Sequence, residues 1–417
     1  MTDRTRASNG RSSIYQDKHG TWHAWVTVGT KPNGQLDRRH RRGKTRAEVT
    51  AKVRDLERER DGGRVTKAGT GKLAVADYLA DWLEASRVRV KVKTWVGYDV
   101  DIRVHINPVI GTKKLAQLRP EDIEKIYLKM TDDEKSPATV AHVRRTLRKA
   151  LGDAEKRDYL KRNPVPLATA PRLEEAETEP LTAAEAKRVL RASEGLRNGA
   201  AWVIALSLGL RRGEVLGLRW GDVDLDTGVL RVRKALQRHP WRHGCEADAP
   251  CGKKRGADCP ARFGGGLVLT TLKSKAGKRE MALPEPLAKL LQAHRRSQRK
   301  EQLAAGSRWR NEYGLVFAQP DGAPIDPDAH GRGWHDVLKR ADVRAARLHD
   351  ARHTAATLLL VQQVDPRVVM EILGWSSASM AKRYQHVVSE LQQLAAKRMT
   401  AALWESTATR TATTSVA

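Results

Sequence analysis

The chain has 417 residues, more than one hydrophobic core usually organises, so we expect two or three domains. Hydrophobic residues make up 40% of it, and its formal charge of +28 indicates a polyanionic partner such as nucleic acid, with a generally cationic protein as the alternative. Because it has no apolar run of about 18 residues and no apolar segment of a signal peptide, we expect a cytoplasmic protein of the bacterial nucleoid without a membrane partner.

Residues 1–65 are expected to form a small domain of three strands and one helix. Turn-forming segments separate three strand-like runs, which cover residues 13–15, 22–28 and 35–41. Thr45 and Glu48 have the spacing of a capping box, which predicts that a helix begins there. Four arginines lie on or beside the third run: Arg38, Arg39, Arg41 and Arg42. Such a strand can lie in a DNA groove, whereas a solvated basic edge that resists aggregation is the alternative.

Residues 70–165 are expected to be entirely helical, because apolar side chains recur at helical spacing in four successive stretches. The last stretch carries a basic row opposite its apolar stripe, made of Arg144, Arg145, Arg148 and Lys149. This row predicts a face that follows the phosphates of DNA, or else a solvated face. A proline-rich linker follows at 163–179.

A third domain is expected over residues 178–402, and the Thr- and Ala-rich tail 403–417 is expected to be mobile. Thr182 and Glu185 predict the capping box of its first helix. Strand-like runs then follow between two groups of helices, near 229–238, 267–272 and 279–283.

The residues suited to chemistry fall in three separate stretches of this domain. They are Gly209-Leu210-Arg211-Arg212-Gly213-Glu214, then Lys273–Leu283, then His349-Asp350-Ala351-Arg352 with Leu373-Gly374-Trp375 and Tyr384. Cleavage of a phosphodiester by a protein hydroxyl needs a nucleophile, cations on the non-bridging oxygens and an acid for the leaving oxygen. Arginine suits the second task, because its planar fork grips two phosphate oxygens and keeps its charge.

In this order, the motifs resemble the signature of the tyrosine recombinases, the phage integrase family. The resemblance assigns a role to each position: phosphate clamps Arg211 and Arg352, structural carboxylate Glu214, hydrogen-bonding His349 and nucleophile Tyr384. It places the acid for the leaving group on Lys273, with Lys275 as the alternative. Trp375 stands where most members have a second histidine, and its indole donates one hydrogen bond but cannot shuttle protons.

The resemblance also implies the architecture. Residues 1–65 resemble an arm-type DNA-binding domain, residues 70–165 resemble the SAM-like core-binding domain, and residues 178–402 would be the mixed α+β catalytic domain of a tyrosine recombinase. The Trp- and Arg-rich composition is similar to integrases of actinobacterial phages or integrative plasmids.

The implied activity is site-specific recombination, which integrates or excises a phage or other mobile element through a 3′-phosphotyrosyl link, with no cofactor for catalysis. The implied partners are double-stranded DNA with core and arm-type attachment sites, three further copies of the chain in a homotetramer, and an excisionase or host DNA-bending protein. Two alternatives are a type IB topoisomerase and a catalytically silent DNA-binding regulator built on the same fold.

Residues 239–266 depart from the family pattern and contain all three cysteines, an odd number that does not indicate a disulfide framework. A structural zinc site is one interpretation, with the ligands His243, Cys245, Cys251 and Cys259. Free thiols in a flexible basic loop are the alternative. In either case the basic run 253–255 is a candidate DNA contact.

Overall fold

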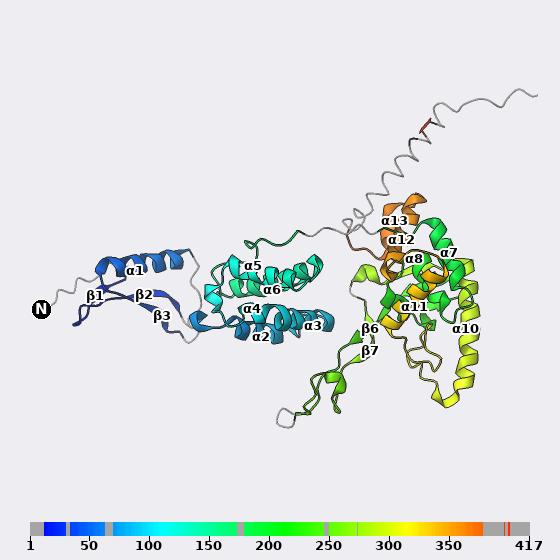
Figure 1. Ribbon diagram of the computed structural model, residues 1–417, viewed down its shortest axis with the longest axis horizontal. Coiled ribbons are helices and arrows are strands. Elements are labelled where there is room, and N and C mark those ends of the chain that lie inside the picture. The colour runs from blue at the N-terminus through cyan, green and yellow to red at the C-terminus, as the bar shows by residue number, and fades with distance from the viewer. Residues whose placement is uncertain are drawn as a thin grey trace, which may run out of the picture. The chain divides into compact units, whose positions relative to one another are not determined.

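The computed structural model describes residues 12–30, 34–62, 70–172, 179–245, 250–272 and 274–377, with the single positions 396, 399 and 400. It divides into two compact units, residues 1–175 and 176–417 (Figure 1). None of the helices in these ranges is both long and apolar enough to span a membrane.

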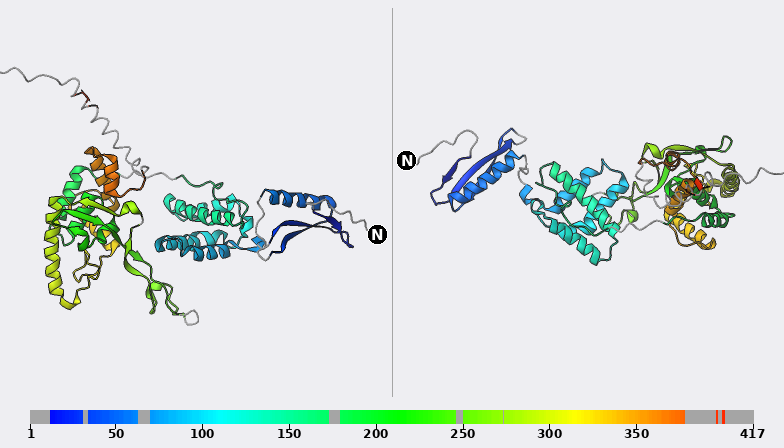
Figure 2. Two further views of the ribbon diagram at one scale, coloured as in Figure 1. Left: turned by 180° about the vertical axis from the view of Figure 1, so that it is seen from behind. Right: turned by 90° about the horizontal axis from the view of Figure 1, so that it is seen from above.

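Unit 1 begins with a three-stranded antiparallel sheet. Its strands run in the order β1 (Ile14–Gln16), β2 (Trp22–Thr30) and β3 (Leu36–Gly43), followed by helix α1 (Arg46–Asp61). Figure 2 shows α1 lying along one face of this sheet, where Val49, Val53 and Leu56 pack on the buried residues of β2.

Only half of the capping box predicted for α1 forms. The Thr45 hydroxyl accepts a hydrogen bond from the Glu48 amide at 3.2 Å, as the spacing predicts. The Glu48 carboxylate, however, accepts from the Lys44 amide at 2.9 Å and from the Lys52 ammonium at 2.6 Å. The Glu48 carboxylate thus bonds to the Lys52 ammonium and the Lys44 amide, and not to the Thr45 amide as in a complete capping box.

The rest of unit 1 is helical, as predicted. Its helices are α2 (Val75–Ser86), α3 (Val92–Val100), α4 (Asn107–Ile110), α5 (Pro120–Asp132) and α6 (Pro137–Lys156), with a π-helical turn over Asp101–Ile106 between α3 and α4. One core joins them. Two buried polar contacts fix α2 on α6: Tyr78 Oη donates to the Ala150 carbonyl at 2.8 Å, and Trp82 Nε1 donates to Asp153 Oδ2 at 2.9 Å.

Unit 2 combines helices with two small sheets. The helices are α7 (Ala183–Ser193), α8 (Gly199–Leu208), α9 (Arg212–Leu216), α10 (Glu285–Ala305), α11 (Pro327–Arg340), α12 (Leu348–Val361) and α13 (Pro366–Leu373). One sheet has the order β4-β5-β8, and the other is the pair β6-β7. These strands are β4 (Val223–Asp224), β5 (Val229–Val232), β6 (Lys234–His239), β7 (Gly266–Thr271) and β8 (Arg279–Ala282). The predicted capping box of α7 is present, with Thr182 and Glu185 bonded in both directions.

The single strand expected near 229–238 is wrong, because this run divides at Arg233 into two strands of different sheets. The first part, β5, pairs with β8, and the second part, β6, pairs with β7. Burial alternates along β5, whereas the neighbouring Ala235 and Leu236 are both buried in β6. The run carries no turn-forming residue at the break, so its sequence does not indicate the change of partner.

Candidate active site

The centre of the site is a buried carboxylate held between two arginines. Helix α8 ends at Gly209, which has a left-handed backbone (φ 62°), and the chain turns there into α9. Glu214 on α9 accepts from Arg211 Nη1 at 2.7 Å and from the Arg211 amide at 3.1 Å. Glu214 Oε2, the oxygen that accepts from the Arg211 amide, also accepts from Arg279 Nη2 at 3.0 Å. Burial on its own would raise the pKa of Glu214, but the charges and hydrogen bonds of Arg279 and Arg211 lower it, so the group stays ionised.

The sequence motifs assigned no role to Arg279, which the structure shows to be the second cation bonded to Glu214. It begins strand β8, and only 3% of its side chain is exposed. Its Nε donates to the Ile372 carbonyl at 2.6 Å and its Nη1 donates to the Gly277 carbonyl at 3.0 Å. The available signal was strand alternation, because β8 buries Arg279 together with Met281 on one face. A cation at a core position of a strand indicates a buried partner, which here is Glu214.

Arg352 joins three elements of unit 2. It lies on α12 and is 3% exposed. Its Nη1 donates to the Gly209 carbonyl at 2.6 Å and its Nη2 donates to the Leu373 carbonyl at the end of α13. A Cβ on Gly209 would lie 2.4 Å from Leu373 Cδ2, so glycine is needed there for space as well as for its backbone angle.

His349 lies one turn before Arg352, and part of its surface is exposed. Desolvation of its ring, with the nearby His353, Arg352 and Arg211, lowers its pKa to about 4. Its imidazole is therefore neutral at neutral pH. Arg352, one turn after His349, donates to the Gly209 carbonyl two residues before Arg211. The structure therefore brings these three predicted residues into one region, although Arg211 is distant from the other two in sequence.

Trp375 follows Gly374, the left-handed residue that ends α13. The indole is 5% exposed, belongs to the small apolar cluster of α12 and α13, and lines a cavity of about 900 Å³ together with Lys278 and Arg279. A Cβ on Gly374 would approach the Ala276 carbonyl to 2.6 Å, so the loop between β7 and β8 packs against this turn.

Three predicted features are not described by the structure. Tyr384, Lys273 and the tail 403–417 lie outside the described residues. Lys275 begins a one-turn 3₁₀ helix that ends at Gly277. The backbone of Lys275 thus lies in the loop that contacts the turn at Gly374. This position does not decide between Lys273 and Lys275 as the acid for the leaving group.

The face of the β1–β3 sheet opposite α1 carries a row of stacked aromatic rings. The His23 ring lies 5.5 Å from Tyr15 and 5.0 Å from His40, and the His40 ring lies 4.8 Å from Trp25. Tyr15 and Trp25 are almost half exposed. This face offers rings and arginines together, a combination that suits contact with nucleic acid.

The basic row predicted on α6 is only partly available. Arg145 and Arg148 are exposed, but Arg144 is partly buried. Lys149 forms an ion pair with Asp153 at 2.8 Å, which offsets its charge locally. Arg145 and Arg148 are therefore the two of the four predicted cations that are most available to contact DNA phosphates.

Comparison with known proteins identifies the family of this chain. The sequence matches the model of the Phage integrase family over residues 258–390 and that of the Phage integrase, N-terminal SAM-like domain over residues 74–131. An integrase from Saccharopolyspora erythraea is 41% identical, over 96% of this chain and 98% of its own length. A protein named Tyrosine recombinase XerC-like, from Caldanaerobacter subterraneus subsp. tengcongensis, is 31% identical over 87% of this chain and 91% of its own length.

Among solved structures, the Tn1549 transposon integrase in complex with transposon right end DNA is similar in fold. Its TM-score is 0.61 at 20% identity, and the match covers 78% of this chain and all of that one. Fold and site together define a tyrosine recombinase, an enzyme that cuts and rejoins DNA at specific sites. More particularly, the chain belongs to the phage integrase family, which confirms the resemblance and the predicted fold class.

Proposed function

We propose that this site-specific recombinase integrates and excises a mobile element by a 3′-phosphotyrosyl mechanism in which Tyr384 is the nucleophile. The main support is geometric. The buried Glu214 fixes Arg211, and Arg352 donates to the Gly209 carbonyl two residues before Arg211. His349 lies one turn before Arg352 on α12. Two fixed cations and a neutral imidazole are what a pentavalent phosphorus centre needs from its surroundings.

In the proposed reaction, the Tyr384 phenol releases its proton to solvent, and its oxygen attacks phosphorus while the bond to the 5′ oxygen breaks. The 3′ phosphate becomes esterified to tyrosine, and the 5′ oxygen leaves with a proton from Lys273, or from Lys275 in the alternative. A 5′ hydroxyl of the partner duplex then attacks the phosphotyrosine and returns its proton to the lysine, while the released tyrosine oxygen takes up a proton from solvent. Because one phosphate ester replaces another at each step, strand exchange needs no ATP.

The arginines differ in how they would meet the phosphate. Arg211 keeps 39% of its side chain exposed while Glu214 fixes its Nη1, so its charge is held at an accessible surface. Arg352 is buried and orients the groups around it. The neutral His349 ring would bond a non-bridging oxygen, and the arriving phosphate charge would raise its pKa from about 4.

Double-stranded DNA is the substrate, and we assign its contacts to two surfaces of unit 1. The sheet with Tyr15 and Trp25 would bind arm-type sites, and the exposed face of α6 with Arg145 and Arg148 would bind the core site. Each phosphate contact releases counterions, so affinity should fall steeply with salt.

Recombination of two duplexes cuts four strands, and each copy of the chain would supply one Tyr384. A homotetramer on paired attachment sites follows from this count, and we place it in the bacterial nucleoid. An excisionase or a host DNA-bending protein would set the direction of the reaction.

The proposal is tested with a nicked duplex that carries the junction sequence of the element encoding this gene, since the short strand diffuses away and traps the covalent adduct. We expect a denaturation-resistant protein–DNA adduct with the wild type and with the control Tyr313→Phe, and none with Tyr384→Phe, while DNA affinity stays unchanged. An adduct formed by Tyr384→Phe would overturn the assignment of the nucleophile. Absence of any adduct from the wild type would favour the silent regulator.

The acid is identified with a substrate whose 5′ bridging oxygen is replaced by sulfur, because a thiolate leaves without protonation. Lys273→Ala should be inactive on the oxygen substrate and recover on the sulfur substrate, whereas Lys275→Ala should behave alike on both. The reverse pattern would assign the role to Lys275. If the wild-type protein relaxed supercoiled plasmid that lacks the junction sequence as fast as plasmid that carries it, the topoisomerase would be favoured instead.

A further inference from the structure

The hairpin of β6 and β7 ends in an insertion that departs from the rest of unit 2. Figure 1 shows the two strands extending from the helices of the unit. Beyond them the chain folds back on itself, because Arg242 and Phe263 exchange backbone hydrogen bonds at 3.0 and 3.1 Å. The described residues between these strands therefore form an ordered tip.

This tip has almost no hydrophobic core. Within the described parts of 240–265, Cys259 is the one residue classed as buried, at 2% exposure. Phe263, the large apolar side chain nearest to it in sequence, is 49% exposed. A segment of this size that buries so little apolar surface needs a cross-link or a metal to stay ordered.

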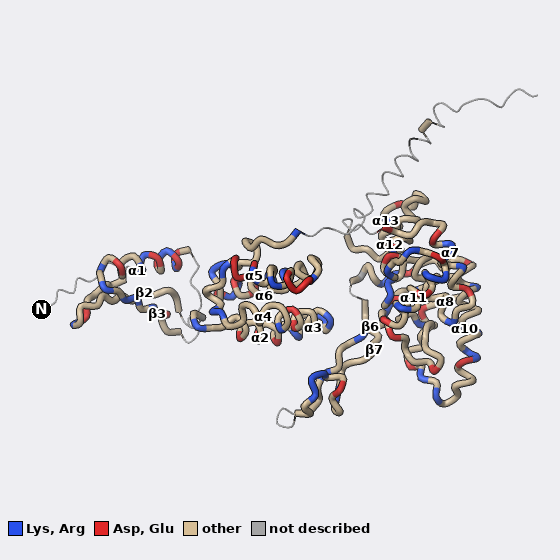
Figure 3. Tube along the Cα trace, in the orientation of Figure 1, with Lys and Arg blue, Asp and Glu red and all other residues tan. Residues whose placement is uncertain are grey.

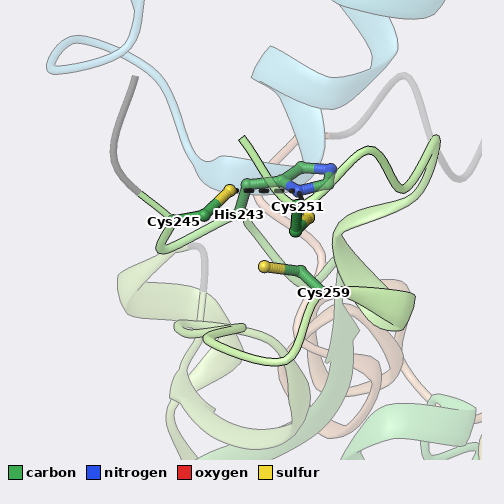
Figure 4. A group of neighbouring side chains, drawn as sticks. All are labelled: His243, Cys245, Cys251 and Cys259. Atoms are coloured by element: carbon green, nitrogen blue, oxygen red, sulfur yellow. Dashed lines mark hydrogen bonds between the residues drawn. The ribbon is translucent and has the colours of Figure 1, made fainter. Parts of the chain in front are cut away.

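Four side chains of the tip point toward a common centre (Figure 4). The ligand atoms of His243, Cys245, Cys251 and Cys259 all lie within 4.8 Å of one another. His243 Nδ1 is 3.3 Å from Cys251 Sγ and 3.9 Å from Cys245 Sγ. A tetrahedral zinc ion with bonds of about 2.0–2.3 Å places its ligand atoms roughly 3.5–3.8 Å apart. The observed separations are thus close to those of a zinc site.

The backbone around the cluster is packed too tightly for a flexible loop. A Cβ on Gly244 would lie 2.1 Å from the Ala261 carbonyl oxygen, and a Cβ on Gly256 would lie 2.1 Å from the Trp241 carbonyl oxygen. Glycine at both positions lets separate stretches of the tip approach each other closely. These glycines therefore serve close packing around the cluster and do not indicate a mobile linker.

We propose that His243, Cys245, Cys251 and Cys259 bind a structural Zn²⁺ ion that holds the tip of the β6–β7 hairpin together. Four protein ligands complete a tetrahedron and leave no open position for water or substrate, so the ion is structural and takes no part in strand cleavage. Its binding free energy would replace the core that the tip lacks.

The ion would also fix a basic surface. Lys253 and Lys254 lie between the second and third cysteines, and Figure 3 shows basic positions on the loops beyond β6 and β7. Both lysines are exposed. A tip of fixed shape would hold these two charges in one place on the DNA backbone, which a flexible loop would not do.

The test is the metal content of the full-length protein purified without chelators. We expect about one zinc per chain by elemental analysis, and X-ray absorption that fits one nitrogen and three sulfur ligands at about 2.0–2.1 and 2.3 Å. Cobalt exchanged into the site should give the intense visible bands of a tetrahedral thiolate complex. His243→Asn and Cys251→Ser should lose most of the metal, while the matched control His239→Asn, at the end of β6, should keep it.

Metal content well below one zinc per chain would overturn the proposal, as would a cobalt spectrum without tetrahedral thiolate bands. If the cysteine variant fails to fold, the wild-type spectra still decide, because they need no substitution. Tyr384→Phe should retain its zinc, so failure of the zinc proposal and failure of the proposed nucleophile are separate results.

Discussion

Replacement of Arg279 by leucine should destabilise unit 2 strongly. The side chains of Arg279 and Glu214 are each 3% exposed, so the substitution leaves a buried carboxylate with Arg211 as its remaining cation and removes the donors to Ile372 and Gly277. Breaking a buried ion pair by removal of one partner costs about 3–5 kcal/mol. The matched control is Arg231→Leu on the neighbouring strand, whose pair with Glu280 is solvent-accessible and worth about 0–1 kcal/mol.

The measurement is denaturant unfolding of the full-length chain, with hydrogen exchange to assign the transition to α9 and β8. Arg279→Leu should lower the free energy of unfolding by several times the effect of Arg231→Leu. The double variant Arg279→Leu/Glu214→Leu should recover part of the loss, since it also removes the buried carboxylate that has lost one of its two cations. If Arg279→Leu and Arg231→Leu lowered the free energy of unfolding equally, the reasoning that Glu214 and its two arginines organise the site would be refuted.

Three further predictions follow from other parts of unit 2. Gly209→Ala should lower stability by about 1–2 kcal/mol for its left-handed backbone, and by more through the clash with Leu373, as measured by thermal unfolding. Burial lowers the pKa of His330 from 6.5 to about 4, so its contribution to folding stability is present above pH 6.5 and is lost as the pH falls from 6.5 to about 4. His330→Leu should therefore flatten the pH dependence of the free energy of unfolding in that window, by at most about 3 kcal/mol. Lys253→Ala with Lys254→Ala should reduce the slope of log affinity against log salt by about 1 per lost phosphate contact.

Much of the fold followed from short-range patterns. The helices of unit 1 were predictable because their apolar spacing reflects one shared core, in which Tyr78 and Trp82 lie as expected. The capping pair of Thr182 and Glu185 marked the first helix of the third domain correctly. The division of the 229–238 run between two sheets was not predictable, because strand partners depend on β7 and β8, which are remote in sequence.

The site, too, has residues that the sequence motifs located and one that depends on remote contacts. The motifs located Arg211, His349 and Arg352, and the structure links them through the hydrogen bond from Arg352 on α12 to the Gly209 carbonyl, two residues before Arg211. Arg279 escaped because its role arises from contacts with Glu214 and the end of α13, at sequence separations of 65 and 93 residues. Strand alternation places Arg279 at a core position of β8, but it does not name the remote partners.

Both arginine systems converge on the last residues of α13. Arg279 donates to the Ile372 carbonyl and Arg352 to the Leu373 carbonyl, at the helix end whose unpaired carbonyls attract cations. The chain that leaves this helix end leads, after Trp375, toward the proposed nucleophile. In the proposed mechanism, the guanidinium groups that would neutralise phosphate or hold its clamp therefore also fix the end of α13, from which the chain continues toward Tyr384. Loss of Arg352 should thus impair the charge at phosphorus and the placement of the attacking oxygen together, so its effect on cleavage should exceed that of a clamp with no contact to α13.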